Sequence, residues 1–391
     1  MDSFDSSGLN AALGWTSWDE FQCVSALAPH GAWVHASDWS TNLVVHANLP
    51  PPASAPVAER TATEVAEHEA VHTVAFVMSD GDNLCWLQGG WKDAAWFGDP
   101  ARLNPNESVP LGWTFSPAAD APLPDVLQWA QSQATANDSF IAGPSGAGYT
   151  YPGLLPDDLK SGFAQATAAM MVDASMSVLN IIGAAPSQES IEHLTSVEGV
   201  GALVYYTYLA GYSGLRGAIS YLNGTLVIGG RVSLWGDDSF STGDETMLGV
   251  QGVADLLSTL PKDPTSPLSY SIIPVNAWSH NYSDVVATSR LLEAAGGFKV
   301  VSPELLVQLL AANTNASESC PLASGSWSES CLDCTISGNG TCILSCGDCS
   351  GMAAACDLAV CHEGLSVDGS SFVCQDGRTC PAAAVSTAEG P

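Results

Sequence analysis

The sequence is poor in basic residues and in charge of any kind. Of its 391 residues, 10 are Lys or Arg against 41 Asp or Glu, so the formal net charge is −31, and only 13% are charged. Ordinary soluble domains have about 25% charged residues. A surface this acidic repels phosphate backbones and anionic lipids, which argues against a nucleic acid or a membrane surface as partner. No run of 18 apolar residues occurs, so no membrane span is expected. The hydrophobic content of 46% is that of a globular protein.

Cysteine is scarce over the first 319 residues, where only Cys23 and Cys85 occur. Ten more crowd into the last part of the chain: Cys320, Cys331, Cys334, Cys342, Cys346, Cys349, Cys356, Cys361, Cys374 and Cys380. An even number of cysteines in a short segment with little apolar content predicts a disulfide-rich module over residues 316–391. Two C-x2-C pairs leave zinc binding open as an alternative.

Six N-glycosylation sequons accompany the cysteines and favour a secreted or extracellular glycoprotein. They begin at Asn106, Asn137, Asn223, Asn281, Asn315 and Asn339. The first residues have neither a basic region nor an apolar core, so no signal peptide is visible. We therefore expect the chain to be a fragment of a longer protein. Residues 1–60 are interpreted as the remnant of an N-terminal domain and a Pro-rich linker.

Residues 68–315 alternate between apolar runs and amphipathic segments. Strands are predicted at 74–78, 111–115, 140–142, 178–182, 201–206, 226–234, 270–275 and 298–301. Helices are predicted at 123–133, 156–174, 245–260, 283–295 and 303–312. This alternation predicts an α/β fold, and the length fits a (β/α)8-like barrel, possibly irregular. A doubly wound sheet is the alternative, although the turn after the first strand is not a Gly-rich dinucleotide turn.

Polar and aromatic side chains gather where the predicted strands end, the position of active sites in barrels. The candidate catalytic carboxylates are Asp80, Asp82, Asp237 and Asp238. The candidate substrate-binding residues are Asn83, Gly146, Gly148, Tyr149, Tyr151, Tyr206, Trp235, Asn276, Trp278 and His280. Flat aromatic rings, carboxylates and amides together are the parts of a sugar-binding site.

Each of these candidates also has a purely structural interpretation. The segment Asp80-Gly81-Asp82-Asn83 could be a turn held by its own side chains. The pair Asp237-Asp238 could cap a helix, His280 could be a structural histidine, and Tyr206 could belong to the core.

The segment Gly146-Ala147-Gly148-Tyr149-Thr150-Tyr151-Pro152 carries the pattern GxGYxYP. With residues 79–83, 111–114 and 116–117 in the same order, it resembles the GxGYxYP family of putative glycoside hydrolases over roughly residues 72–310. The resemblance implies a barrel-like C-terminal domain that hydrolyses carbohydrate, often beside an N-terminal domain. The cysteine-rich tail lies outside it.

The leading hypothesis is therefore a glycosidase that acts on an extracellular polysaccharide or glycoconjugate. Asp80 or Asp82 would work with a partner on another loop, Asp237 or Asp238, and no cofactor or metal is expected. One alternative is a metal-dependent polysaccharide deacetylase, and His68-Glu69-Ala70-Val71-His72 does fit the H-E-x-x-H zinc pattern. The other alternative is a non-catalytic carbohydrate-binding protein.

Overall fold

The computed structural model describes residues 10–15, 19–49, 69–184, 190–208, 212, 217–236 and 247–314. It also describes the backbone of three short strands near the C-terminus, which form an antiparallel sheet. These are β14 (Ser366–Val367), β15 (Ser371–Val373) and β16 (Thr379–Pro381). Of the twelve cysteines, only Cys23 and Cys85 have described side chains, and both are free. The predicted disulfide-rich module lies outside the described residues.

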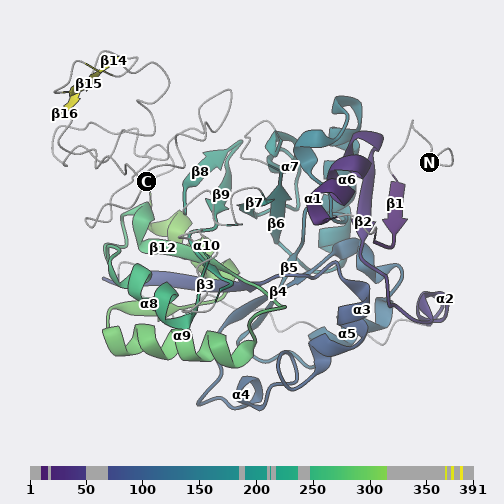
Figure 1. The fold of residues 1–391 in the computed structure, drawn as a ribbon, viewed down its shortest axis with the longest axis horizontal. Coiled ribbons are helices and arrows are strands. Elements are labelled where there is room, and N and C mark those ends of the chain that lie inside the picture. Colours follow the sequence, from purple (N-terminus) through teal and green to yellow (C-terminus); the bar gives the residue numbers. More distant parts are fainter. Residues whose placement is uncertain are drawn as a thin grey trace.

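An 11-stranded, mostly parallel sheet forms the centre of the molecule (Figure 1). Its strands are β3 (His72–Met78), β4 (Leu111–Phe115), β5 (Asp138–Ala142), β6 (Val178–Gly183), β7 (Ala202–Thr207), β8 (Ile219–Leu222), β9 (Thr225–Gly229), β10 (Ser233–Leu234), β11 (Met247–Leu248), β12 (Tyr270–Val275) and β13 (Phe298–Val300). The order is β11-β10-β12-β3-β4-β5-β6-β7-β9-β8, and β13 also pairs with β3. Among these pairings only β8–β9 is antiparallel.

The predicted α/β fold is confirmed, and so are all eight predicted strands, although the run 226–234 is divided between β9 and β10. The closed (β/α)8-like barrel is not confirmed, because the strand order has two ends, β11 and β8. The segment between β9 and β10 forms backbone hydrogen bonds with both β7 and β12. Gly230 N donates to Tyr205 O of β7, and Arg231 N donates to Ile272 O of β12.

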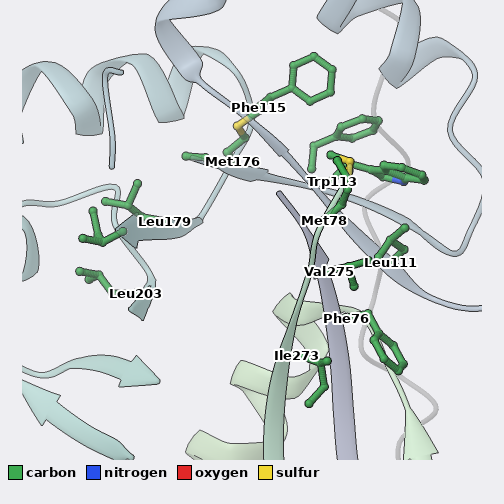
Figure 2. Close-up of a cluster of buried hydrophobic side chains, with 14 of the residues drawn as sticks. Phe76, Met78, Leu111, Trp113, Phe115, Met176, Leu179, Leu203, Ile273 and Val275 are labelled. Carbon is green, nitrogen blue, oxygen red and sulfur yellow. The ribbon is translucent and has the colours of Figure 1, made fainter. Parts of the chain in front are cut away.

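Most of the strands are buried at every residue because both faces of the sheet are covered. In β3, Val74, Phe76 and Met78 belong to one buried cluster, whereas Ala75 and Val77 belong to a second cluster on the other face. Figure 2 shows the first cluster, in which side chains from β3, β4 and β12 pack together. This continuous burial explains why unbroken apolar runs predicted the strands correctly.

Helices follow most of the strands (Figure 1). They are α3 (Leu84–Gln88), α4 (Pro100–Leu103), α5 (Pro124–Ser132), α6 (Asp157–Asp173), α7 (Glu192–Thr195), α8 (Val250–Ser258), α9 (Tyr282–Ala295) and α10 (Pro303–Asn313). Local sequence sets several of their starts. Ser302 caps α10 and is followed by Pro303, and Asn281 with Asp284 forms a capping box at α9.

An N-terminal unit packs beside this sheet. It comprises β1 (Asn10–Leu13), α1 (Glu20–Leu27), β2 (Ala32–His35) and α2 (Leu43–His46), with β1 and β2 paired in parallel. Val34 of β2 exchanges two backbone hydrogen bonds with Tyr149, of 2.8 and 3.0 Å. The first residues of the chain thus contact the segment that carries the GxGYxYP pattern. The domain boundaries proposed from the sequence stay a prediction.

Candidate functional site

A pocket of about 280 Å³ lies at the carboxyl ends of the strands. It is lined by Trp15, Glu20, Ala36, Asp38, Ser79, Asp80, Asp82, Asn83, Pro144, Tyr149, Ile182, Tyr212, Trp235, Asn276 and Trp278. Seven of the fourteen residues predicted for the site are in this set: Asp80, Asp82, Asn83, Tyr149, Trp235, Asn276 and Trp278. The loops after parallel strands meet at one edge of the sheet, which brings these residues together.

The loop after β3 is held close to β4, and a glycine makes this possible. Gly81 N donates to Thr114 Oγ1 at 3.1 Å, and Ser116 N donates to Gly81 O at 2.9 Å. A Cβ at Gly81 would lie 2.0 Å from Thr114 O, so no other residue fits there without moving the backbone. Asp80 takes a left-handed conformation with φ of 68°. The loop is therefore more than a surface turn, and it presents both aspartates to the pocket.

Asp80 is held by two donors. The Ser79 hydroxyl donates to Asp80 Oδ2, and Trp278 Nε1 donates to Asp80 Oδ1 at 2.9 Å. Burial raises the pKa of Asp80 above its usual value, and these two hydrogen bonds partly offset the rise because they stabilise the ionised form.

Asp82 has a different environment. Its side chain is 5% exposed, and among the described residues the carboxylate accepts a hydrogen bond only from its own backbone. Burial first, and then the negative charges of Asp80 and Glu20, raise the pKa of Asp82 well above its usual value. A buried carboxyl group without a cation beside it favours the protonated form, which can donate a proton.

A third carboxylate, half-buried like that of Asp80, comes from Glu20, the first residue of α1. The hydroxyl of Tyr149 and that of Tyr212 both donate to Glu20 Oε1, the latter at 2.9 Å. The pKa of Glu20 is raised above its ordinary value: burial raises it most, the two tyrosine hydrogen bonds offset part of this rise, and the charge of Asp80 adds to it. The sequence analysis missed this residue. Only its position at a helix start, after the capping Asp19 and near Trp15, marked it in the sequence.

The GxGYxYP pattern packs against both the N-terminal unit and α6. A Cβ at Gly148 would lie 2.1 Å from Cδ1 of Trp33, and one at Gly146 would lie 2.6 Å from Oγ1 of Thr167 in α6. Tyr151 is fully buried, with its ring 5.8 Å from that of Tyr149. Gly146, Gly148 and Tyr151 do not line the pocket, so direct contact of these three with a sugar is not supported. Tyr149 does line it, although it is only 3% exposed.

Aromatic rings border the pocket. The side chain of Trp278 is 61% exposed and its ring lies 5.8 Å from that of Trp86. Trp235 stacks on Tyr212, with ring centroids 4.5 Å apart. Trp15 lines the same space. An exposed indole beside buried carboxyl groups is the arrangement expected of a carbohydrate site, because sugar rings present flat apolar faces.

The remaining candidates have structural positions. Asn276 lines the pocket, but its Oδ1 accepts bonds from the backbone N–H groups of Trp278 and Ser279. His280 contacts Gly236 O through Nε2 at 2.7 Å and Asp284 through Nδ1 at 3.2 Å, and it does not line the pocket.

Tyr206 belongs to the second buried cluster, and its hydroxyl has no partner among the described residues. Asn83 caps α3, and its side chain accepts from Trp86 N. Asp237 and Asp238 lie outside the described residues.

Within the described part of the chain, no group of three His, Cys, Asp or Glu side chains is arranged to hold a metal ion. The H-E-x-x-H pattern is not on a helix, because His72 begins β3. Both ring nitrogens of His72 have partners, Pro261 O at 2.9 Å and Ser271 Oγ at 2.8 Å. His68 is not among the described residues. His72 therefore has a structural role and does not line the pocket.

Comparisons with known proteins agree with this architecture. The structure is similar to a crystal structure of a putative hydrolase from Bacteroides thetaiotaomicron, with a TM-score of 0.64 and 24% sequence identity. The similarity covers 78% of this chain and 57% of that one, so this chain spans little more than half of its length. No curated protein matches. Residues 70–311 match the GxGYxYP putative glycoside hydrolase C-terminal domain. With well over half of its length matched, the chain belongs to the GxGYxYP family.

Proposed function

We propose that the protein is a glycoside hydrolase that cleaves its carbohydrate substrate by carboxylate chemistry. The observation that carries this proposal is the pocket itself, where Asp82 is buried and, among the described residues, has no cation as a neighbour. Two other carboxylates and an exposed tryptophan line the same pocket. Cleavage of a glycosidic bond needs one protonated carboxyl group as general acid and one ionised carboxylate. Of the two aspartates, Asp82 is the one that favours the protonated form and Asp80 the one that favours the ionised form, because only Asp80 has hydrogen-bond donors from other residues.

In this mechanism Asp82 donates its proton to the glycosidic oxygen, and the electron pair of the breaking bond stays on that oxygen. Asp80 acts through charge and position. Its carboxylate raises the pKa of Asp82, and its hydrogen bond orients Trp278 at the pocket border. Neither Asp80 nor Asp82 forms an ion pair with a described Lys or Arg. This favours catalysis over a purely binding role, because a salt bridge would hold the acids ionised.

The test is hydrolysis. The protein is incubated with a panel of aryl glycosides and polysaccharides, and new reducing ends are measured with and without a chelator. Cleavage that survives the chelator supports the proposal. Release of acetate in place of reducing ends, lost with the chelator, would establish the metal-dependent deacetylase. Saturable binding of a polysaccharide without any cleavage would establish the non-catalytic alternative.

Trp278 is expected to bind the substrate by stacking. Trp278→Ala should raise KM roughly fivefold, because one sugar–indole contact is worth on the order of 1 kcal/mol. Since the side chain is 61% exposed, the melting temperature should change little. Trp278→Phe keeps a ring and should restore most of the affinity. An unchanged KM in Trp278→Ala would show that the indole does not contact the sugar.

Secretion is part of the same proposal. Among the sequons of the described residues, Asn106 and Asn223 are exposed; Nδ2 of Asn223 donates to Ser196 Oγ at 2.9 Å, whereas Asn106 lies in the loop between α4 and β4. In contrast, Nδ2 of Asn137 donates to Ser108, and the side chain of Asn281 caps α9. If the protein passes through a secretory route, a glycan is expected first at Asn106. Within the described residues, no helix is long and apolar enough to cross a membrane.

A further inference from the structure

The two aspartates of the pocket do not by themselves make a complete hydrolase site. Asp80 and Asp82 are two residues apart on one loop, directly after β3. The two carboxyl groups of a glycosidase flank the bond that is cleaved, so they come from opposite sides of the substrate. A partner for Asp82 must therefore come from another element of the fold.

Glu20 meets this requirement. It begins α1, in the N-terminal unit, and it lines the same pocket as Asp82. Both tyrosine hydroxyls that contact it donate to Oε1. No described group donates to Oε2, which leaves this oxygen available for a substrate. We propose that Glu20 is the second catalytic carboxylate, and that the active site is complete only when the N-terminal unit is docked.

The contacts around Glu20 explain how it is fixed. The Val34–Tyr149 backbone pair joins β2 to the segment after β5, and Thr150 Oγ1 donates to Ala32 O at 3.3 Å. On α1 itself, the ring of Phe21 lies 5.7 Å from that of Tyr151. Residues 148–151 thus hold both the backbone of the N-terminal unit and the carboxylate of Glu20. Catalytic groups work best when packing and hydrogen bonds lock their positions in this way.

The hydrogen bonds from Tyr149 and Tyr212 to Glu20 also fit the role of this residue as a catalytic carboxylate. Burial raises the pKa of both tyrosine hydroxyls well above the ordinary value, so they remain donors throughout the working pH range. Two donors on one oxygen stabilise the ionised carboxylate of Glu20. Asp82 lacks such donors, and its pKa is raised well above the ordinary value. Asp82 is therefore the better proton donor of the two and Glu20 the better carboxylate, which is the combination that the chemistry requires.

Two balanced routes use this pair. In the first, Glu20 Oε2 bonds to the anomeric carbon while the bond to the glycosidic oxygen breaks, and that oxygen takes the proton of Asp82. Water then attacks the same carbon, gives its proton to Asp82, and the electron pair of the broken ester returns to Glu20. In the second, water attacks the anomeric carbon directly and gives a proton to Glu20, while the glycosidic bond breaks and its oxygen takes the proton of Asp82; solvent later restores both groups. Each route consumes one water molecule.

This inference rests on the proposed function, and leaving-group dependence tests it. On the glycoside that the wild type cleaves, Glu20→Gln should lose on the order of 10³-fold in kcat with both a sugar and a 2,4-dinitrophenyl leaving group. Asp82→Asn should be inactive on the substrate with the sugar leaving group. It should recover much of its rate on the 2,4-dinitrophenyl glycoside, because that leaving group needs no general acid. Asp19→Asn is the matched control, because asparagine caps a helix as well as aspartate, and its rate should stay near normal.

Two further measurements keep the test independent of folding. Azide should restore turnover to Glu20→Ala and yield a glycosyl azide of inverted anomeric configuration, and the configuration of the sugar that the wild type releases, retained or inverted, identifies the route. Tyr149→Phe removes a hydrogen bond that lowers the pKa of Glu20. The acidic limb of its pH–rate profile should therefore move to higher pH, a change that lost packing would not produce.

The outcomes separate the two proposals. If Asp82→Asn is inactive with the sugar leaving group while folded Glu20→Gln retains near-normal rates, the role of Glu20 is wrong and the proposed function stands. An acidic limb that is unmoved in Tyr149→Phe also counts against Glu20. If the wild type cleaves no glycoside in the panel, the proposed function fails, and the role of Glu20 fails with it.

Discussion

Asp82→Asn should abolish most glycoside hydrolysis and at the same time make the protein more stable at neutral pH. An amide has nearly the shape of the carboxyl group but has no proton to give to the leaving oxygen. Loss of a general acid typically costs roughly 10² to 10⁴-fold in rate. Because the shape is preserved, lost packing would not explain the lost activity.

The stability change follows from the pKa of Asp82. In the unfolded chain an aspartate ionises near pH 3.9, whereas in the folded protein burial and the charges of Asp80 and Glu20 hold its pKa well above that value. Below about pH 4 the group is protonated in both states, so its contribution to stability is fully present. As pH rises through the folded-state pKa that contribution is lost, because the unfolded chain ionises more readily.

Asparagine removes this pH dependence. The free energy of unfolding of Asp82→Asn should therefore exceed that of the wild type at pH 7 to 8, and the difference should shrink towards pH 4. Urea denaturation at a series of pH values measures it, beside turnover with the sugar leaving group. A variant that is inactive but less stable than the wild type at every pH would indicate a structural turn. A variant that remains active would return the role of general acid to another carboxyl group.

Gly148→Ala should destabilise the protein and reduce its activity together. The new methyl group would lie 2.1 Å from Cδ1 and 2.8 Å from Cγ of Trp33, whose indole is 8% exposed and packs 6.0 Å from the ring of Phe163. Overpacking of this kind costs typically about 1–3 kcal/mol, and occasionally more. The displaced indole belongs to β2, so the Val34–Tyr149 pair and the position of Glu20 should be disturbed as well.

A double-mutant cycle provides the control. Trp33→Leu lowers the free energy of unfolding by itself, but it makes room for a methyl group at position 148. In the Trp33→Leu background, the addition of Gly148→Ala should therefore lower the free energy of unfolding little further. Thermal denaturation and kcat are measured for the four proteins. Equal destabilisation by Gly148→Ala with and without Trp33 would show that the contact with the indole is not the cause. Normal activity in a destabilised Gly148→Ala would show that the site does not depend on the docking of β2.

Local sequence determined the strands and several helix starts. The runs in β3, β6 and β12 are mainly apolar because each strand is buried at every residue, on both faces of the sheet. The cap at Ser302 and the following Pro303 act within one turn of α10, so no distant residue was needed to predict that helix start. The strand-end location of Asp80, Asp82 and Trp278 followed from the same strand pattern.

Only the tertiary structure decided which groups meet. Tyr149 and Glu20 are separated by 129 residues and Tyr212 and Glu20 by 192, and no periodicity in the sequence encodes their hydrogen bonds. Local sequence also failed to predict the surroundings of His280 and Tyr151. His280 lies near the site residues in sequence yet contacts Gly236, and Tyr151 is buried. Local sequence fixes backbone conformation over a few residues. The partners of a side chain, and hence its pKa and its role, depend on how distant segments pack.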